Sequence, residues 1–188
     1  WGIPVGGYSS YCLLENSQNV STCIWHSGSL PSTYSDSSGD GPFVLTAFLK
    51  NDYGISSPVD SNSVTIDRTP PSLASAVVTN PDPTNDPSFG LSYGAITDGP
   101  YSDYCINQNN SNVSTCTWTA GPVPSTFSVT AVDGAKTLTI WLRDTAGNVS
   151  SPITTSSVTY DGTPPTVGIA TPASGSFVNS ANVSSFAV

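Results

Sequence analysis

Short runs of alternating apolar and polar residues recur along this chain, separated by clusters of Gly, Pro, Asn and Asp. The clearest run covers residues 137–143, in which Leu138, Ile140 and Leu142 alternate with Thr and Trp. Successive side chains of a strand point to opposite faces, so this run predicts a strand with one apolar face in a core. Since no segment has a helical period, the pattern indicates an all-β chain.

Between residues 73 and 160 the alternation predicts strands at 73–79, 89–93, 104–107, 115–119, 126–132, 137–143 and 156–160. About seven short strands separated by turn residues are typical of an Ig-like β-sandwich. We therefore expect the all-β chain to form Ig-like sandwiches.

The sequence contains an internal repeat. A shift of 93 residues places Cys12 on Cys105 and Cys23 on Cys116, with 15 of the 27 positions from Tyr8 to Tyr34 identical. After one inserted residue near Gly147 the shift becomes 94, and residues 58–71 match residues 152–165 at 8 of 14 positions. The repeat is thus about 94 residues long, which is the size of a single domain.

Both repeats end in an Asp-x-Thr-Pro-Pro linker, at residues 67–71 and 161–165. Paired prolines favour an extended, stiff backbone. We predict three segments: 1–67, an Ig-like repeat lacking its first two strands; 68–161, a complete repeat; and 162–188, the first strands of a third repeat.

Residues 162–188 correspond to the part that residues 1–67 lack, so the 188 residues make two whole periods. Our hypothesis is that the chain is the repeating unit of a long filament. Either it is a window on a continuous chain, or its last residues complete the first repeat of a neighbouring subunit by donor-strand complementation. An arbitrary fragment of matching length is the remaining interpretation.

Charged residues make up 9% of the chain, 13 acidic and 4 basic, for a net charge of −9. Four basic residues spread over the whole length cannot form the basic stripe that nucleic acid requires. The apolar runs fall far short of the roughly 20 residues of a membrane helix. Nucleic-acid binding and membrane insertion of this segment are therefore not expected.

The catalytic inventory is poor, since the single His26 occurs in only one repeat and no phosphate loop, nucleophile elbow or metalloprotease helix is present. We expect no enzyme and no required cofactor. Cys12 and Cys23 have the same spacing as Cys105 and Cys116, which favours the disulfides Cys12–Cys23 and Cys105–Cys116. Disulfides indicate an oxidising compartment, hence an extracellular or cell-surface location.

Two aromatic residues lie at equivalent positions on the side of a strand that the alternation predicts to be polar. These are Phe48 and Trp141, candidates for exposed contacts in a lateral interface or ligand platform, with half-buried packing as the alternative. Five Asn residues head Asn-x-Ser sequons and are candidate glycosylation sites: Asn19, Asn109, Asn112, Asn148 and Asn182. In a chain this rich in Asn and Ser, such sequons also arise by chance.

Several Asp residues recur at equivalent places. Asp67 and Asp161 begin the linkers, where they either bind structural calcium or cap a turn. Asp40-Gly41 and Asp133-Gly134 are typical of hairpin turns.

Residues 137–150 and 158–165 resemble the late strands and linker of bacterial Ig-like (Big-type) repeats, found in tandem in large secreted or surface-anchored proteins, including adhesins. The resemblance covers both repeats and the start of a third. It implies a calcium site formed by Asp67, Asp144 and Asp161.

The leading interpretation is a structural repeat of a filament or stalk, whose partners are copies of itself or neighbouring Ig-like domains. The alternative is an adhesin repeat that binds glycan or a partner cell surface.

Overall fold

The structure is a computed structural model that describes residues 6–168, 175 and 177. Two compact units are distinguished within the described residues. The first takes in the chain up to Ser72 together with Ile96–Asp103 and Leu142–Ser150, and the second takes in the rest. The predicted segment boundaries at 67/68 and 161/162 stay a prediction, and most of the predicted segment 162–188 lies outside the described residues.

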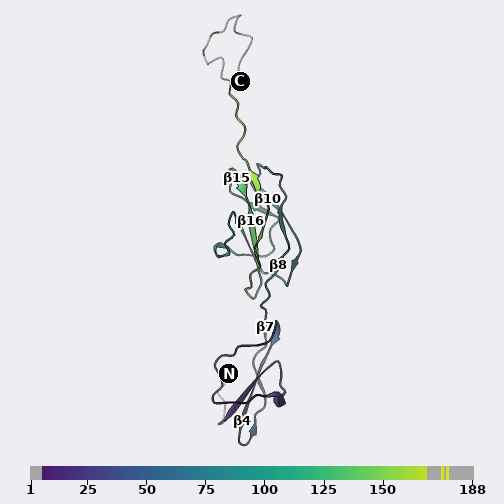
Figure 1. The fold of residues 1–188 in the computed structure, drawn as a ribbon, viewed down its shortest axis with the longest axis vertical. Coiled ribbons are helices and arrows are strands. Elements are labelled where there is room, and N and C mark those ends of the chain that lie inside the picture. Colours follow the sequence, from purple (N-terminus) through teal and green to yellow (C-terminus); the bar gives the residue numbers. More distant parts are fainter. Residues whose placement is uncertain (1–5, 169–174, 176, 178–188) are drawn as a thin grey trace. The chain divides into compact units, whose positions relative to one another are not determined.

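In the first repeat, one antiparallel sheet has the order β2-β1-β4-β5. β6 also pairs with β4, nearer the beginning of β4 than β5 does. Its strands are β1 (Ser10–Glu15), β2 (His26–Ser27), β4 (Leu45–Asn51), β5 (Gly54–Ile55) and β6 (Val59–Asp60). A second pair is formed by β3 (Gly41–Phe43) and β7 (Val64–Ile66). β4 and β7 are labelled in Figure 1.

The second repeat has a four-stranded central sheet in the order β13-β12-β16-β17, in which β17 is the equivalent of β6. Its strands are β12 (Asp103–Gln108), β13 (Thr119–Ala120), β16 (Leu138–Arg143) and β17 (Ile153–Thr154). β15 (Gly134–Lys136) pairs with β18 (Val158–Tyr160), as β3 pairs with β7. The equivalent pairs follow the equivalent sequence, so the repeat in sequence is also a repeat in strand order.

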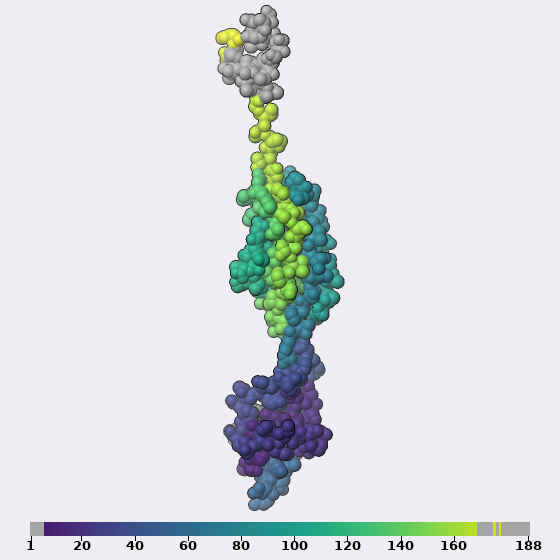
Figure 2. Space-filling view, viewed as in Figure 1, coloured from purple at the N-terminus to yellow at the C-terminus, as the bar shows by residue number. Residues whose placement is uncertain are grey.

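The second repeat also contains strands that have no counterpart among the described residues of the first. β10 (Ser88–Tyr93) pairs with β9 (Ala76–Val78) and β14 (Thr126–Ser128), while β8 (Ser72–Leu73) pairs with β11 (Ile96–Thr97). β18 is bridged to the loop before β10 through Thr84 and Tyr160. Figure 2 shows the lime segment that includes β18 at the surface, between the blue-teal segment that includes β8 to β10 and the green segment that includes β15.

β16 forms the centre of the core. Leu138, Ile140 and Leu142 are fully buried, as the alternation predicts. The opposite face is buried too, because Thr139 is 1% and Trp141 2% exposed. The prediction of an exposed contact was therefore wrong for Trp141, and equally for Phe48, which is 3% exposed.

The register of the disulfide hairpin accounts for the burial of Phe48. Phe48 on β4 lies opposite Cys12 on β1, and directly opposed residues of an antiparallel pair share a face. Cys12 is itself fully buried and bonded to Cys23, at the end of the hairpin. The half-cystine thus lies next to the aromatic ring on the face that the sequence pattern assigns to solvent.

The predicted strand at 115–119 was also wrong. A 3-10 turn, η2 (Val113–Thr115), occupies its start, and only Thr119 belongs to a strand. Asn112 accepts the backbone N–H of Ser114, which turns the chain before it reaches Cys116. The equivalent turn in the first repeat is η1 (Val20–Thr22), with Asn19 in the same role.

Truncation of the core strand tests this description. We expect Ile140→Ala to lower the free energy of unfolding by about 2–5 kcal/mol, since it removes a fully buried side chain and leaves a cavity. The matched control is Val77→Ala at a position 54% exposed, for which we expect a change within about 0.5 kcal/mol. Chemical denaturation of both variants measures the difference, and equal losses would contradict the assignment of β16 to the core.

Candidate functional site

An aspartate clamps the start of the linker in both repeats. In the first repeat the Asp40 carboxylate accepts the backbone N–H of Arg68 at 3.0 Å and the hydroxyl of Thr69 at 2.6 Å. In the second repeat the Asp133 carboxylate accepts the backbone N–H of Gly162 at 2.7 Å and the hydroxyl of Thr163. The same two carboxylate-to-linker contacts therefore occur in both copies.

The linker Asp residues complete this clamp. Asp67 accepts the backbone N–H of Thr69, and Asp161 accepts that of Thr163, both at 3.1 Å. This is the turn-capping arrangement that the sequence analysis left open beside calcium. Each linker Thr is thus held twice, by its hydroxyl and by its main chain.

The clamp depends on a local backbone feature. Gly41 and Gly134 follow the clamping aspartates with φ of 134° and 127°, a conformation that residues with a Cβ rarely adopt. These glycines begin β3 and β15, which pair with β7 and β18, the strands that lead into the linkers. The Asp-Gly turn therefore brings the carboxylate beside the residues that leave the repeat.

Hydrogen bonding lowers the pKa of both clamping aspartates. For Asp133 the main cause is the Thr163 hydroxyl, followed by the Gly162 N–H, and for Asp40 it is the Thr69 hydroxyl. In the first repeat Arg68 adds an ion pair to Asp36 at 2.6 Å, for which Gly162 has no equivalent. The shared part of the clamp is therefore the carboxylate with the backbone N–H and the Thr hydroxyl that it accepts.

Asp144, another predicted calcium ligand, is buried, with 5% exposure. Its carboxylate accepts the backbone N–H of Asn148 and the Asn148 amide Nδ2, each at 2.9 Å. Burial raises the pKa of Asp144, but these hydrogen bonds outweigh it and the net pKa is lowered. Among the described residues no group of three or more His, Cys, Asp or Glu side chains is placed to hold a metal. Calcium binding by Asp67, Asp144 and Asp161 stays a prediction.

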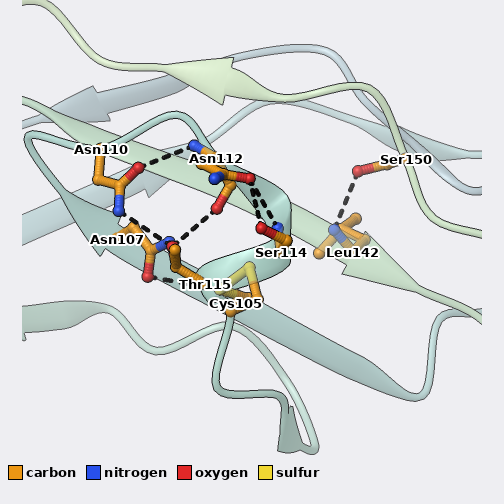
Figure 3. Close-up of a disulfide and its surroundings, with 9 residues drawn as sticks. Cys105, Asn107, Asn110, Asn112, Ser114, Thr115, Leu142 and Ser150 are labelled. Carbon is orange, nitrogen blue, oxygen red and sulfur yellow. Dashed lines mark hydrogen bonds between the residues drawn. A yellow bond between two sulfur atoms is a disulfide. The ribbon is translucent and has the colours of Figure 1, made fainter.

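Both disulfides have the pairing expected from the spacing, with Cα atoms 5.7 Å apart in each. Figure 3 shows the second hairpin, where Asn107 and Asn110 both donate to the Thr115 hydroxyl at 3.0 Å. The hairpin is thus held by the disulfide and by amide and hydroxyl groups, without a buried residue in its 3-10 turn.

The Asn side chains of the described sequons differ in their exposure and in their hydrogen-bond partners. Asn19 and Asn112 are exposed and accept hydrogen bonds through Oδ1 from Ser21 and Ser114. Asn109 uses both ends of its amide, accepting from Thr137 N–H and donating to the Ala135 carbonyl. Asn148 is half-buried against Asp144, and Asn182 lies outside the described residues.

Part of the first repeat leaves apolar side chains uncovered. Val64 on β7 is 53% exposed, whereas its equivalent Val158 on β18 is 6% exposed. In the second repeat, β8, β9 and β10 contribute four buried apolar side chains: Leu73, Ala76, Phe89 and Leu91. We call the exposed surface around Val64 on β7 the open face.

The first repeat also has a shallow cavity of about 310 Å³, lined in part by Tyr8, Lys50 and Tyr53. Tyr53 is 97% exposed. The cavity is open to solvent and contains none of the predicted site residues.

No family model matches the chain, and no curated protein matches it. Among solved structures, it resembles the fibronectin(III)-like modules of Clostridium thermocellum CbhA, at 13% identity and TM-score 0.41 over 84% of this chain and 82% of that one. It also resembles the FN1-FN3 domains of chicken CNTN1, at 11% identity and TM-score 0.43 over 82% of this chain and 57% of that one.

A third similar structure is a tetra-tandem repeat from the extending region of a large adhesion protein, at 15% identity and TM-score 0.36 over 83% of this chain and 43% of that one. This chain thus spans about half the length of the second and third structures. The all-β class expected from the sequence is confirmed by the strands themselves, and the Ig-like form of the sandwich stays a prediction. Membership of the Big-type family stays a prediction. No helix among the described residues is long and apolar enough to cross a membrane.

The lowered pKa of the clamp predicts its acid limit. Because the folded pKa of Asp133 lies below the ordinary 3.8, the clamp is complete above that pH and is lost as pH falls through the lower folded value. We expect the amide NMR signal of Gly162, whose N–H the Asp133 carboxylate accepts, to titrate with a midpoint below 3.8. In Asp133→Asn, which still accepts a hydrogen bond but does not ionise, this titration should vanish. A midpoint at or above the ordinary value would contradict the clamp.

Proposed function

We propose that the chain is a structural repeat of an extracellular bacterial filament or stalk. The observation that carries this proposal is the clamp, because the same carboxylate and Thr contacts fix the start of the linker in both repeats. In a structural array the chain must leave each repeat with the same local geometry before it enters the next. A clamp formed twice by equivalent residues meets that need.

The linker itself suits this role. The clamped Thr is followed in both copies by Pro-Pro, at 70–71 and 164–165. Proline fixes φ and favours the polyproline II conformation, which is extended and locally stiff. The clamp therefore anchors a spacer that has little freedom of its own.

The extracellular assignment rests on the disulfides and the composition. All four cysteines are paired, and the polar surface is built from Ser, Thr and Asn, with only 9% charged residues. Disulfides persist in oxidising compartments and are rare in the cytosol.

The open face favours assembly by strand complementation. In the second repeat the residues that supply the buried strands β8, β9 and β10 begin directly after a linker, and residues 166–188 follow the next linker in the same phase. A strand added from outside supplies both main-chain hydrogen bonds and apolar side chains. We propose that residues 162–188 of one copy cover the open face of another.

The alternative function, an adhesin repeat that binds glycan, is favoured by the cavity beside Tyr8 and Tyr53. Exposed aromatic rings beside polar groups are suited to stack on sugars. The second repeat has Ala146 or Gly147 where the first has the exposed Tyr53, so such a site would belong to the first repeat only.

Two substitutions matched in exposure test the filament proposal. We expect Val64→Asp, at a position 53% exposed, to abolish polymer formation, because it places a charge on the open face. Val77→Asp, at 54% exposure on β9, is the control and should leave polymerisation unchanged. Negative-stain imaging and sedimentation of both variants measure assembly.

The free energy of unfolding of Val64→Asp shows whether a loss of polymer reflects a lost interface or a chain that no longer folds. A folded chain that no longer polymerises supports strand exchange between copies. If the variant polymerises like the unsubstituted chain, the open face is not the interface and strand complementation fails. If neither the variant nor the unsubstituted chain assembles, and imaging of native material shows no continuous array, the adhesin alternative replaces the filament.

A further inference from the structure

We propose that Asn19 and Asn112 are acceptors of N-linked glycans, so that each repeat carries one glycan at the same place on its disulfide hairpin. The inference does not depend on the filament proposal. It rests on the hydrogen-bond partners of the Asn side-chain amide in each described sequon.

Both residues are exposed, and their surroundings are the same in the two repeats. Asn19 Oδ1 accepts the Ser21 hydroxyl at 2.7 Å and the Ser21 N–H at 3.2 Å. Asn112 Oδ1 accepts the Ser114 hydroxyl at 2.8 Å and the Ser114 N–H at 3.0 Å. Within the described part of the chain, neither Nδ2 has a hydrogen-bond partner, so the nitrogen that would react is free in both copies. Figure 3 shows the second site, with the Ser114 bonds directed to one end of the Asn112 amide.

This geometry suits the chemistry of the transfer. An amide nitrogen is a weak nucleophile because its lone pair is delocalised onto Oδ1. Two donors on Oδ1 stabilise the negative charge that grows there as Nδ2 loses a proton. The proposed donor is a polyprenyl-diphosphate-linked oligosaccharide. The bond from Nδ2 to the sugar C1 forms and the bond from C1 to the diphosphate oxygen breaks. The polyprenyl diphosphate leaves with the electron pair of that bond, and the proton lost from Nδ2 passes to water.

The other described sequons lack a free amide. Asn109 has a left-handed φ of 51° and donates Nδ2 to the Ala135 carbonyl at 3.2 Å. Its repeat equivalent Asn16 has φ 49° and accepts the Val44 N–H at 2.8 Å, although it heads no sequon. The role of this position is therefore structural in both repeats. Asn148 donates Nδ2 to the Asp144 carboxylate at 2.9 Å and is half-buried.

The test offers the full folded chain to an oligosaccharyltransferase that accepts Asn-x-Ser, with a polyprenyl-diphosphate-linked oligosaccharide as donor. Peptide mass mapping reports each sequon separately. We expect glycan on Asn19 and Asn112 and none on Asn109 or Asn148. The same chain, reduced and denatured, shows that the enzyme and donor are active.

Three serine variants sharpen the result. Ser21→Ala should lose the glycan of Asn19, and Ser114→Ala that of Asn112, each without effect on the other site. Ser111→Ala removes the Asn109 sequon at an exposed position and should leave the pattern unchanged. Circular dichroism of each variant confirms that it is folded.

Two outcomes would overturn the assignment. One is a folded chain that stays unmodified at Asn19 and Asn112 while the denatured chain is glycosylated. The other is equal occupancy of Asn109 or Asn148 in the folded chain, because the amide contacts would then decide nothing.

Discussion

A strand buried on both faces needs a cover on each, and the remaining features of the repeat depend on this requirement. β16 is buried at all positions from Leu138 to Leu142, and β4 is buried from Leu45 to Phe48. The disulfide hairpin lies beside the outer face, since Cys12 is the cross-strand neighbour of Phe48. A loop of polar residues has no apolar anchors of its own, so the disulfide must hold it there, which is worth roughly 2–3 kcal/mol for a loop of this size. The opposite side needs further strands. The second repeat has β8, β9 and β10 there, and the open face of the first repeat is where the described residues provide none.

This arrangement shows why the sequence predicts the class of fold well and the exposure of single residues less well. Alternation and turn residues identify the all-β class and place Leu138, Ile140 and Leu142 in the core, because both are local properties. The same alternation wrongly assigns Phe48 and Trp141 to solvent, because period 2 distinguishes the two faces of a strand and does not reveal whether a distant hairpin covers the second face. The repeated cysteine spacing identifies the disulfides. It does not show that Asn112 turns the chain into η2 where a strand was predicted at 115–119.

The clamp illustrates a second limit of sequence reasoning. Asp40 and Asp133 recur with their glycines, and the hairpin-turn interpretation accounts for the backbone but not for the carboxylates. Their partners, Thr69 and Thr163, lie 29 and 30 residues further along the chain, where no local pattern connects them. The available signal was that the Asp and the linker Thr recur together in both repeats. An Asp that only forms a turn does not require a Thr at a fixed place in the linker. Asp67 and Asp161 were assigned to either calcium or a turn, and the structure gives their carboxylates the N–H groups of that same Thr.

The position of the two free sequon amides connects the hairpin to the problem of strand edges. Each hairpin leads directly into an edge strand, β2 in the first repeat and β13 in the second. An exposed edge carries unpaired N–H and C=O groups that can pair with other chains, and many proteins protect such edges with charged side chains. This chain has only 4 basic and 13 acidic residues over its 188 positions, so little charge is available for that purpose. A hydrated glycan on Asn19 and on Asn112 would shield β2 and β13 without adding charge. Assembly through strand addition at the open face requires that pairing elsewhere be suppressed, and a bulky polar group beside the edge strands β2 and β13 provides a physical means of suppressing it.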